Sequence, residues 1–268
     1  MNKFIKHTVV ALAIGCSVNV VASDIVYWDE TESFERLVSS EYKDDFAKLS
    51  VYYQPQENKM FCGVASAAIV LNALRVEKKA NQIPLDSTKF STHETGYLPN
   101  GGGNVEHSNK TYSTWSPLFH RYTQNTVLIK SPKPRIEILG KPASGDDFKD
   151  YGLQLHQFTD LIEANNATIT SYELKTIDSL ESVKSNMLKV LKKKDHYLVV
   201  NYARAGVNQK GGGHYAPVGA YDSDSNSFLI LDPNNADYLW HWVDADLMIK
   251  AMNTVDVGGY RGYSVITD

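Results

Sequence analysis

The chain has 268 residues, a length that fits one large domain or two small ones and that can bury a substantial core without disulfides or metals. Hydrophobic residues make up 43% of the chain and charged residues 22%, which is the balance of a globular protein and excludes a largely disordered one. The formal net charge is -4 and there is no long run of basic residues, so nucleic acid is not expected as a partner.

The first 23 residues have the composition of a secretory signal peptide. Two lysines precede the apolar stretch TVVALAIGCSVNVVAS, which ends in small residues suited to cleavage after residue 22 or 23. The stretch is shorter than the roughly 20 apolar residues that a membrane-spanning helix needs. We therefore predict a signal peptide over residues 1–23 and a periplasmic or secreted domain over residues 24–268, with no stable membrane insertion. Lipid attachment at Cys16 is the less favoured alternative.

The next two segments predict short helices followed by a loop. Residues 34–49 carry apolar side chains at helical spacing. Residues 51–60, VYYQPQENKM, are polar and interrupted by proline, which is typical of a loop. A glutamine side chain can donate a hydrogen bond to a developing oxyanion. Gln56 is the candidate for that role, and Gln54 is the competing one.

Cys62 opens a run of small and apolar residues, CGVASAAIVLNALR, that predicts a helix buried on all sides over residues 62–75. Removal of the signal peptide takes away the other cysteine, Cys16, and leaves Cys62 without an internal partner. An unpaired thiol in an oxidising compartment is a liability unless it is buried or used. The start of a helix favours a thiolate, because the free amides and the helix dipole stabilise negative charge. This segment alone leaves both a nucleophile and a buried structural cysteine open.

The rest of the chain predicts a loop-rich middle and a β-rich final third. A helix is expected near residues 115–124 within the loop-rich segment 76–150, and further helices over residues 155–162 and 179–195. Strands are expected over residues 168–174, 196–204, 211–222, 227–232 and 263–267. His241, between two tryptophans, is predicted to be a packed residue. This order predicts an α+β domain in which a central buried helix packs against an antiparallel sheet, with the helices on one side.

His214 is the candidate acid/base among the eight histidines. It stands in GGGHYAPVGAYD, where three glycines remove bulk at the start of a strand. The turn DSDSN joins this strand to SFLILD, and if Tyr221 pairs with Ser227, Asp232 lies at the same end of the hairpin as His214. Asp232 can then orient one ring nitrogen of His214 while the other reaches Cys62.

Three segments resemble one family. QENKMFCGVASAAIVLNAL, NYARAGVNQKGGGHYAPVGAYD and FLILDPNNADYLWHWV are similar to the catalytic domain of phytochelatin synthase, a relative of papain-like cysteine peptidases. The 18 residues from His214 to Asp232 and the six residues from Gln56 to Cys62 match the family's spacing. The resemblance covers residues 50–268.

The resemblance implies a papain-like cysteine peptidase fold and a defined chemistry. Such enzymes cleave the Cys–Gly bond of glutathione, release glycine and hold γ-Glu-Cys as a thioester, which they transfer to water or to a second glutathione. It implies that Cys62 is the nucleophile, His214 the acid/base, Asp232 its orienting group and Gln56 the oxyanion donor.

The resemblance also implies a binding pair for the γ-glutamyl group. Asp256 and Arg261 occupy the matching positions near the C-terminus, although their separation is two residues shorter than in the family. No cofactor and no protein metal site are implied, and Cd²⁺ or Zn²⁺ would enter only as glutathione thiolate complexes. Asn235 stands where the family has arginine, and the cysteine-rich C-terminal region of the plant enzymes is missing. We therefore expect the short bacterial form, with hydrolysis of glutathione as its main activity.

Two other functions stay open on the sequence. The same residues would serve a papain-like peptidase that acts on other peptides, as in bacteriocin-leader processing. A scaffold without catalysis would be a thiol- or peptide-binding protein. The sequence also leaves open whether the chain forms a homodimer.

Overall fold

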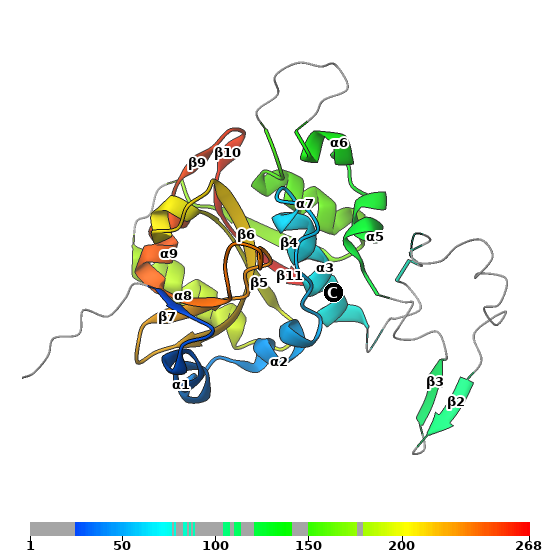
Figure 1. Cartoon of the computed structure of the whole chain (residues 1–268), viewed down its shortest axis with the longest axis horizontal. Helices are drawn as coiled ribbons and strands as arrows, with labels where there is room; N and C mark the ends of the chain where they lie inside the picture. Colours follow the sequence, from blue (N-terminus) through cyan, green and yellow to red (C-terminus); the bar gives the residue numbers. More distant parts are fainter. Residues whose placement is uncertain are drawn as a thin grey trace, which may run out of the picture.

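The computed structural model describes most of the chain beyond the predicted signal peptide (Figure 1). The described residues are 25–76, 78, 83–84, 86, 88, 104–107, 110–113, 121–140, 150–175 and 179–268. The signal peptide predicted over residues 1–23 and most of the helix expected near residues 115–124 lie outside them. Within these ranges, no helix is both long enough and apolar enough to cross a membrane.

A seven-stranded antiparallel sheet is the centre of the described structure (Figure 1). Its strands, in spatial order, are β1 (Ile25–Tyr27), β8 (His241–Asp244), β7 (Ser227–Ile230), β6 (Gly213–Asp222), β5 (Tyr197–Ala203), β11 (Gly262–Thr267) and β4 (Thr168–Glu173). Two separate hairpins are formed by β2 (Asn104–His107) with β3 (Lys110–Ser113) and by β9 (Val255–Asp256) with β10 (Gly259–Tyr260). The five strands predicted from the sequence are confirmed as β4, β5, β6, β7 and β11, whereas β1 and β8 were not predicted.

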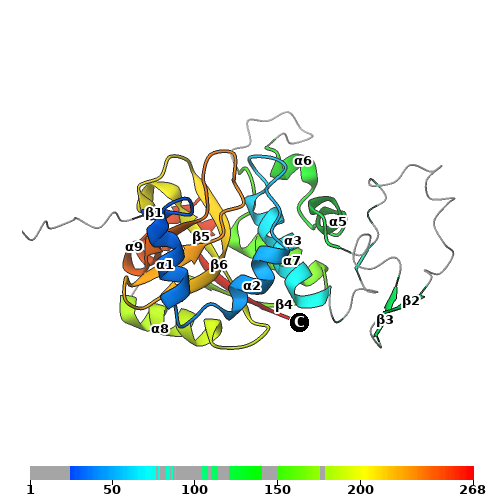
Figure 2. The same cartoon turned by 60° about the horizontal axis from the view of Figure 1, so that its bottom comes forward.

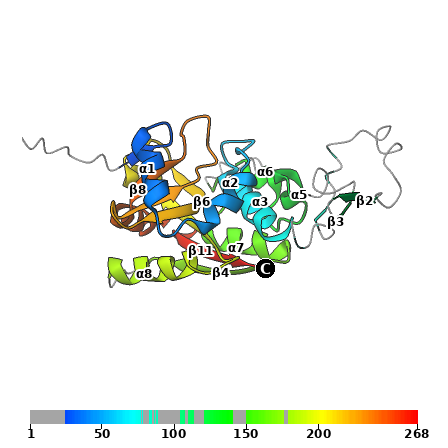
Figure 3. The ribbon, with the colours of Figure 1, turned by 90° about the horizontal axis from the view of Figure 1, so that it is seen from below.

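Helices cover both faces of the sheet, so the prediction that they lie on one side is wrong. The helices are α1 (Thr31–Ser39), α2 (Asp44–Val51), α3 (Cys62–Arg75), α5 (Gln124–Ile129), α6 (Arg135–Ile138), α7 (Leu155–Ala164), α8 (Leu180–Leu191) and α9 (Ala245–Met252). Figures 2 and 3 show α1, α2 and α3 on one side of the sheet and α8 on the other.

The physical reason for two covered faces lies in the central strands. Tyr197 and Val199 of β5 belong to the cluster that packs under α3, while Leu198 and Val200 belong to a second cluster with α8 and α9. A strand that is apolar at consecutive positions must bury both of its faces. The apolar run YLVV at the start of β5 was the signal that a second helical layer was needed.

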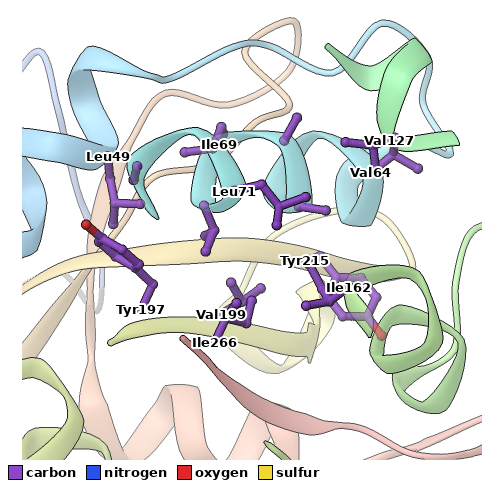
Figure 4. Close-up of a cluster of buried hydrophobic side chains, with 14 of the residues drawn as sticks. Leu49, Val64, Ile69, Leu71, Val127, Ile162, Tyr197, Val199, Tyr215 and Ile266 are labelled. Carbon is purple, nitrogen blue, oxygen red and sulfur yellow. The ribbon is translucent and has the colours of Figure 1, made fainter. Parts of the chain in front are cut away.

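The central helix α3 has the predicted bounds and every one of its residues is buried. Figure 4 shows Leu71 on the side of α3 that faces the sheet, above Val199 and Ile266. Tyr215 of β6 stacks on Phe158 of α7 with ring centroids 4.8 Å apart. Full burial of one such apolar side chain contributes about 1.5–3 kcal/mol, and this packing fixes the start of α3 against β6.

The β6–β7 hairpin has the predicted register at the end that carries His214 and Asp232, but not at the turn. Asp222, rather than Tyr221, pairs with Ser227. A bulge between Val218 and Ala220 then shifts the register by one residue, so that Val218 faces Ile230. A bulge adds one residue to one strand. It therefore cancels the error at the turn and leaves the predicted relation between His214 and Asp232 intact.

Candidate active site

Cys62 is the first residue of α3 and lines a cleft of about 680 Å³. Burial raises the pKa of the Cys62 thiol, but a hydrogen bond with His214, the charge of His214, the Tyr215 backbone and the charge of Arg204 bring that pKa below its ordinary value. Its own N–H has no acceptor within the helix, because the first amides of a helix have none. The position thus favours a thiolate with a free backbone donor beside it.

His214 is the second residue of β6 and lines the same cleft. Its Nε2 donates a hydrogen bond to Asp232 Oδ1 at 2.7 Å. The His214 and Tyr202 rings form a T-shaped pair with their centroids 5.7 Å apart. Burial lowers the pKa of His214, but the Asp232 carboxylate and the Cys62 thiolate raise it above the ordinary value. A depressed cysteine pKa and an elevated histidine pKa together favour a thiolate–imidazolium pair.

Asp232 follows β7 and is fully buried. Its Oδ1 accepts hydrogen bonds from His214, from Arg204 Nη2 at 3.1 Å and from the Asn234 N–H at 2.8 Å. Burial raises the pKa of Asp232, but the charges and hydrogen bonds of His214 and Arg204 hold it well below its usual range. The Tyr53 hydroxyl donates to the Asp232 carbonyl at 2.8 Å, which ties this segment to the loop before α3.

Arg204 is a residue of the site that sequence reasoning missed. It is 3% exposed, its Nη2 lies 2.8 Å from Asp232 Oδ2, and its guanidinium lies 4.3 Å from the centroid of the Tyr238 ring. Its Nη1 donates to Gln209 Oε1 at 2.5 Å. The motif NYAR contained it at the end of a predicted strand, but nothing local indicated which carboxylate it would meet.

His241 is fully buried, which confirms that it is a packed residue. Its Nδ1 donates to the Leu239 carbonyl at 2.9 Å, so its Nε2 accepts from Gln209 Nε2 at 3.2 Å. Burial lowers the pKa of His241. A neutral His241 therefore ends the chain of contacts that runs from Asp232 through Arg204 and Gln209.

The two glutamines of the loop before α3 differ in what they contact. Gln54 Nε2 donates to the Tyr122 carbonyl at 3.0 Å, so its donor already has a partner. The Gln56 N–H donates to the Pro233 carbonyl at 2.8 Å, which fixes this loop beside the segment that carries Asp232. The Gln56 Oε1 is buried without a hydrogen-bond partner among the described residues. These contacts favour Gln56 over Gln54, and its oxyanion role stays a prediction.

Asp256 and Arg261 form an ion pair next to His214. Arg261 Nη2 lies 2.7 Å from Asp256 Oδ2, and Asp256 lines the cleft. A Cβ added at Gly213 would come to 2.8 Å from Arg261 Nη2 and 3.2 Å from Asp256 Oδ2. The glycine before His214 thus lets this pair approach the cleft.

Asn201 is a second residue of the cleft that the sequence did not indicate. It faces Tyr215 across the β5–β6 pair, and its amide neighbours the Tyr215 hydroxyl. Its Oδ1 and the Nε of Arg261 are buried with no hydrogen-bond partner in the described part of the chain. A polar residue inside the apolar run YLVVNYA was the signal that could have pointed to it. Asn235, in contrast, is exposed.

A metal ion has no ready set of ligands among the described residues. No group of three or more histidine, cysteine, aspartate or glutamate side chains there is arranged to hold one.

Comparisons with known proteins converge on one family. A family model described as "Phytochelatin synthase" matches residues 19–93 and 108–263. The chain is 25% identical over 226 residues to Glutathione gamma-glutamylcysteinyltransferase 3 of Lotus japonicus, covering 84% of this chain and 38% of that protein. It is 22% identical over 253 residues to Glutathione gamma-glutamylcysteinyltransferase 2 of Arabidopsis thaliana, covering 94% and 46%. The chain thus spans less than half the length of these relatives.

Proposed function

Because the chain belongs to the phytochelatin synthase family, we propose that it is a glutathione γ-glutamylcysteinyltransferase with Cys62 as its nucleophile. The observation that carries the proposal is the buried chain of contacts from Cys62 through His214 to Asp232 at the wall of an open cleft. Such a chain activates a thiol for attack on a carbonyl. The start of α3, the β6 histidine and the carboxylate after β7 support a papain-like arrangement.

The first half of the reaction forms a thioester and releases glycine. The Cys62 sulfur attacks the carbonyl carbon of the Cys–Gly bond of glutathione, and the carbonyl oxygen gains negative charge. The Cys62 N–H and the Gln56 side chain are the donors that would stabilise this oxyanion. The imidazolium of His214 gives its proton to the glycine nitrogen, the C–N bond breaks, and γ-Glu-Cys remains bound through sulfur.

The second half of the reaction regenerates Cys62. Neutral His214 takes a proton from water, the resulting oxygen attacks the thioester, and the Cys62 thiolate leaves with γ-Glu-Cys as the product. Asp232 keeps the His214 ring oriented and stabilises its charged form in both halves. A second glutathione would replace water if the acyl group were transferred. We propose hydrolysis as the main outcome, because Asn235 provides no cation where the family has arginine.

The γ-glutamyl end of the substrate is proposed to bind at Asp256 and Arg261. This end is a zwitterion, and a carboxylate with a guanidinium supplies one charge of each sign. The unpaired Nε of Arg261 and the unpaired Oδ1 of Asn201 are a further donor and acceptor at the same place. Each such buried atom costs about 1–3 kcal/mol when it is left without a partner, so a polar ligand would be favoured there. Cd²⁺ or Zn²⁺ would take part only as glutathione thiolate complexes.

The test uses the full chain, expressed with its own N-terminus and incubated with glutathione with and without Cd²⁺. Mass spectrometry of the products distinguishes γ-Glu-Cys plus glycine from longer (γ-Glu-Cys)n-Gly species. A matched Cys62→Ser protein is expected to release no glycine. Glycine release by that variant would eliminate the mechanism. The N-terminal sequence of the purified protein tests the proposal that residues 1–23 are removed during export.

A further inference from the structure

Residues 150–154 form a wall of the cleft between the start of α3 and the β9–β10 hairpin. All five residues of this wall line the cleft. A Cβ added at Gly63 would lie 3.1 Å from Leu153 Cδ1, so the wall packs against the residue that follows Cys62. At its other end, Gln154 Oε1 accepts a hydrogen bond from the Gly258 N–H at 3.2 Å. The wall therefore contacts both the helix of Cys62 and the hairpin of Asp256.

A buried lysine supports the wall from behind. The Lys133 side chain is 6% exposed, and its Nζ donates to the Asp150 carbonyl at 3.0 Å, to Asp150 Oδ2 at 2.8 Å and to Gln157 Oε1 at 3.1 Å. Three acceptors use all three hydrogens of an ammonium group. A buried charge is retained only where it is paired in this way. The Lys133 ammonium therefore fixes both the backbone and the side chain of Asp150.

Asp150 in turn fixes the orientation of Gln154. Its Oδ1 accepts a hydrogen bond from Gln154 Nε2 at 2.7 Å. Burial raises the pKa of Asp150, but Lys133 and Gln154 bring it below its ordinary value, so the group is a carboxylate that accepts and does not donate. The amide nitrogen of Gln154 must face Asp150, and its oxygen must then face the Gly258 N–H.

The β9–β10 hairpin needs such an anchor, because it has little structure of its own. Each strand has two residues, and an isolated short hairpin is marginally stable in water. Its base is held by Arg261, whose Nη1 donates to the Val255 carbonyl at 2.8 Å. Its tip carries the exposed residues Val257 and Gly258. The hydrogen bond from Gly258 to Gln154 fixes this tip against the cleft.

We propose that Lys133, Asp150 and Gln154 are positioning residues that hold the β9–β10 hairpin, and with it the Asp256 carboxylate, at the distance from Cys62 that a γ-glutamyl-cysteinyl group requires. This inference rests on the proposed function, because that function assigns the γ-glutamyl group to the hairpin. The three residues form a strut that acts on substrate binding and not on the reacting atoms. Loss of the strut should therefore raise KM for glutathione and leave kcat and the Cys62 thiolate unchanged.

The decisive variant is Gln154→Leu, which keeps the bulk of the side chain and removes both hydrogen bonds. A net hydrogen bond contributes about 1 kcal/mol, or a factor of about five. We expect KM for glycine release from glutathione to rise about fivefold or more, with kcat within a factor of about two. The rate of Cys62 alkylation by iodoacetamide should stay that of the wild type. The matched control is His156→Ala, an exposed position two residues away, which should leave KM unchanged.

A second measurement follows the hairpin without any reaction. Hydrogen–deuterium exchange over residues 255–261 should be about five times faster at the Gly258 amide in Gln154→Leu than in the wild type. Unchanged exchange, or faster exchange with an unchanged KM, would overturn the strut. A wild-type chain that releases no glycine would overturn the proposed function instead, and the exchange rates would still decide whether Gln154 anchors the hairpin.

The same comparison applies to the buried lysine. Lys133→Met should raise KM in the same way, whereas Lys130→Met, at an exposed position nearby, should not. The Lys133 variant leaves the Asp150 carboxylate unpaired and can fail to fold. In that case Gln154→Leu alone decides, because it removes no charge from the interior.

Discussion

Arg204→Met tests whether the buried ion pair between Arg204 and Asp232 helps to lower the pKa of the Cys62 thiol. Arg204 Nη2 lies 2.8 Å from Asp232 Oδ2, and both side chains are almost fully buried. Methionine fills a similar volume without charge. Among the residues that the structure describes, the Asp232 side chain would then keep His214 and the Asn234 N–H as partners. The perturbation therefore separates the charge of Arg204 from its packing.

The size of the effect follows from this burial. Removing one partner of a buried ion pair costs about 3–5 kcal/mol, because the other charge is left uncompensated. For a chain of this length a loss of that size lowers Tm by about 6–20 °C. The Arg204 charge also lowers the pKa of the Cys62 thiol. Its removal should raise that pKa, so thiolate formation moves to higher pH.

Two assays measure these effects independently. Thermal unfolding gives the change in stability, and the pH dependence of Cys62 alkylation by iodoacetamide gives the thiolate fraction. Arg135→Met is the matched control, because Arg135 is exposed and the hydrogen bond described for its side chain goes to the Asn125 side chain in the first turn of α5. Arg204→Lys keeps a cation and should shift the alkylation profile less than Arg204→Met. A stability loss below about 1 kcal/mol, together with an unchanged alkylation profile, would refute the reasoning.

Three further predictions concern the Asp256–Arg261 pair and the stability of the fold. Asp256→Asn removes the negative charge but keeps the shape of the side chain, so KM for glutathione should rise about tenfold or more. The rate of Cys62 alkylation should stay that of the wild type. An unchanged KM in a glycine-release assay would contradict this prediction. Gly213→Ala puts a Cβ 2.8 Å from Arg261 Nη2 and should lower kcat/KM by displacing the same pair; wild-type kinetics would argue against that crowding. Burial raises the pKa of Asp45 from 3.8 to about 8. Between these pH values the folded protein holds a proton on Asp45 that the unfolded chain releases. The free energy of unfolding therefore falls as the pH rises from about 4 to about 8. Asp45→Asn should remove that fall and stabilise the protein at pH 8 by up to about 6 kcal/mol, but not at pH 4; equal Tm values at pH 8 would count against it.

The parts of the fold that the sequence predicted are those with a strong local pattern. The run from Cys62 to Arg75 is apolar on every face, and α3 has those bounds. The alternating and apolar runs of the final third became β5, β6, β7 and β11. The strands β1 and β8 have three and four residues, and they exist because they pair with each other and with β7. Strands this short contain too few residues for an alternation of apolar and polar side chains to be recognised in the sequence.

The candidate site divides in the same way. Cys62 was predictable because it opens an apolar helix, and His214 because three glycines precede it. Asp232 was predictable because the β6–β7 hairpin brings it to the same end as His214. The predicted register at the turn was wrong by one residue. The predicted placement of His214 near Asp232 is still correct, because the bulge after Val218 shifts the register back. Arg204 and Gln154 had no local cue. Their roles depend on which residues of other segments they meet in three dimensions, and a single sequence does not contain those distances.

Buried polar atoms without hydrogen-bond partners help to distinguish an enzyme from a non-catalytic binding protein. Gln56 Oε1, Asn201 Oδ1 and Arg261 Nε are buried without hydrogen-bond partners in the described structure. Asn201 lines the cleft, and Arg261 pairs with Asp256, which also lines it. Gln56 lies in the loop that leads to Cys62. Atoms left in this way cost about 1–3 kcal/mol each, and the packing of α3 against the sheet offsets that cost. A binding protein for peptides would recover the cost on binding, but it would gain nothing from a thiol whose pKa is lowered by a buried imidazole. A lowered thiol pKa beside buried, unpaired polar atoms fits the proposal that the ligand is polar and is also attacked. Binding of glutathione without turnover would favour the non-catalytic alternative.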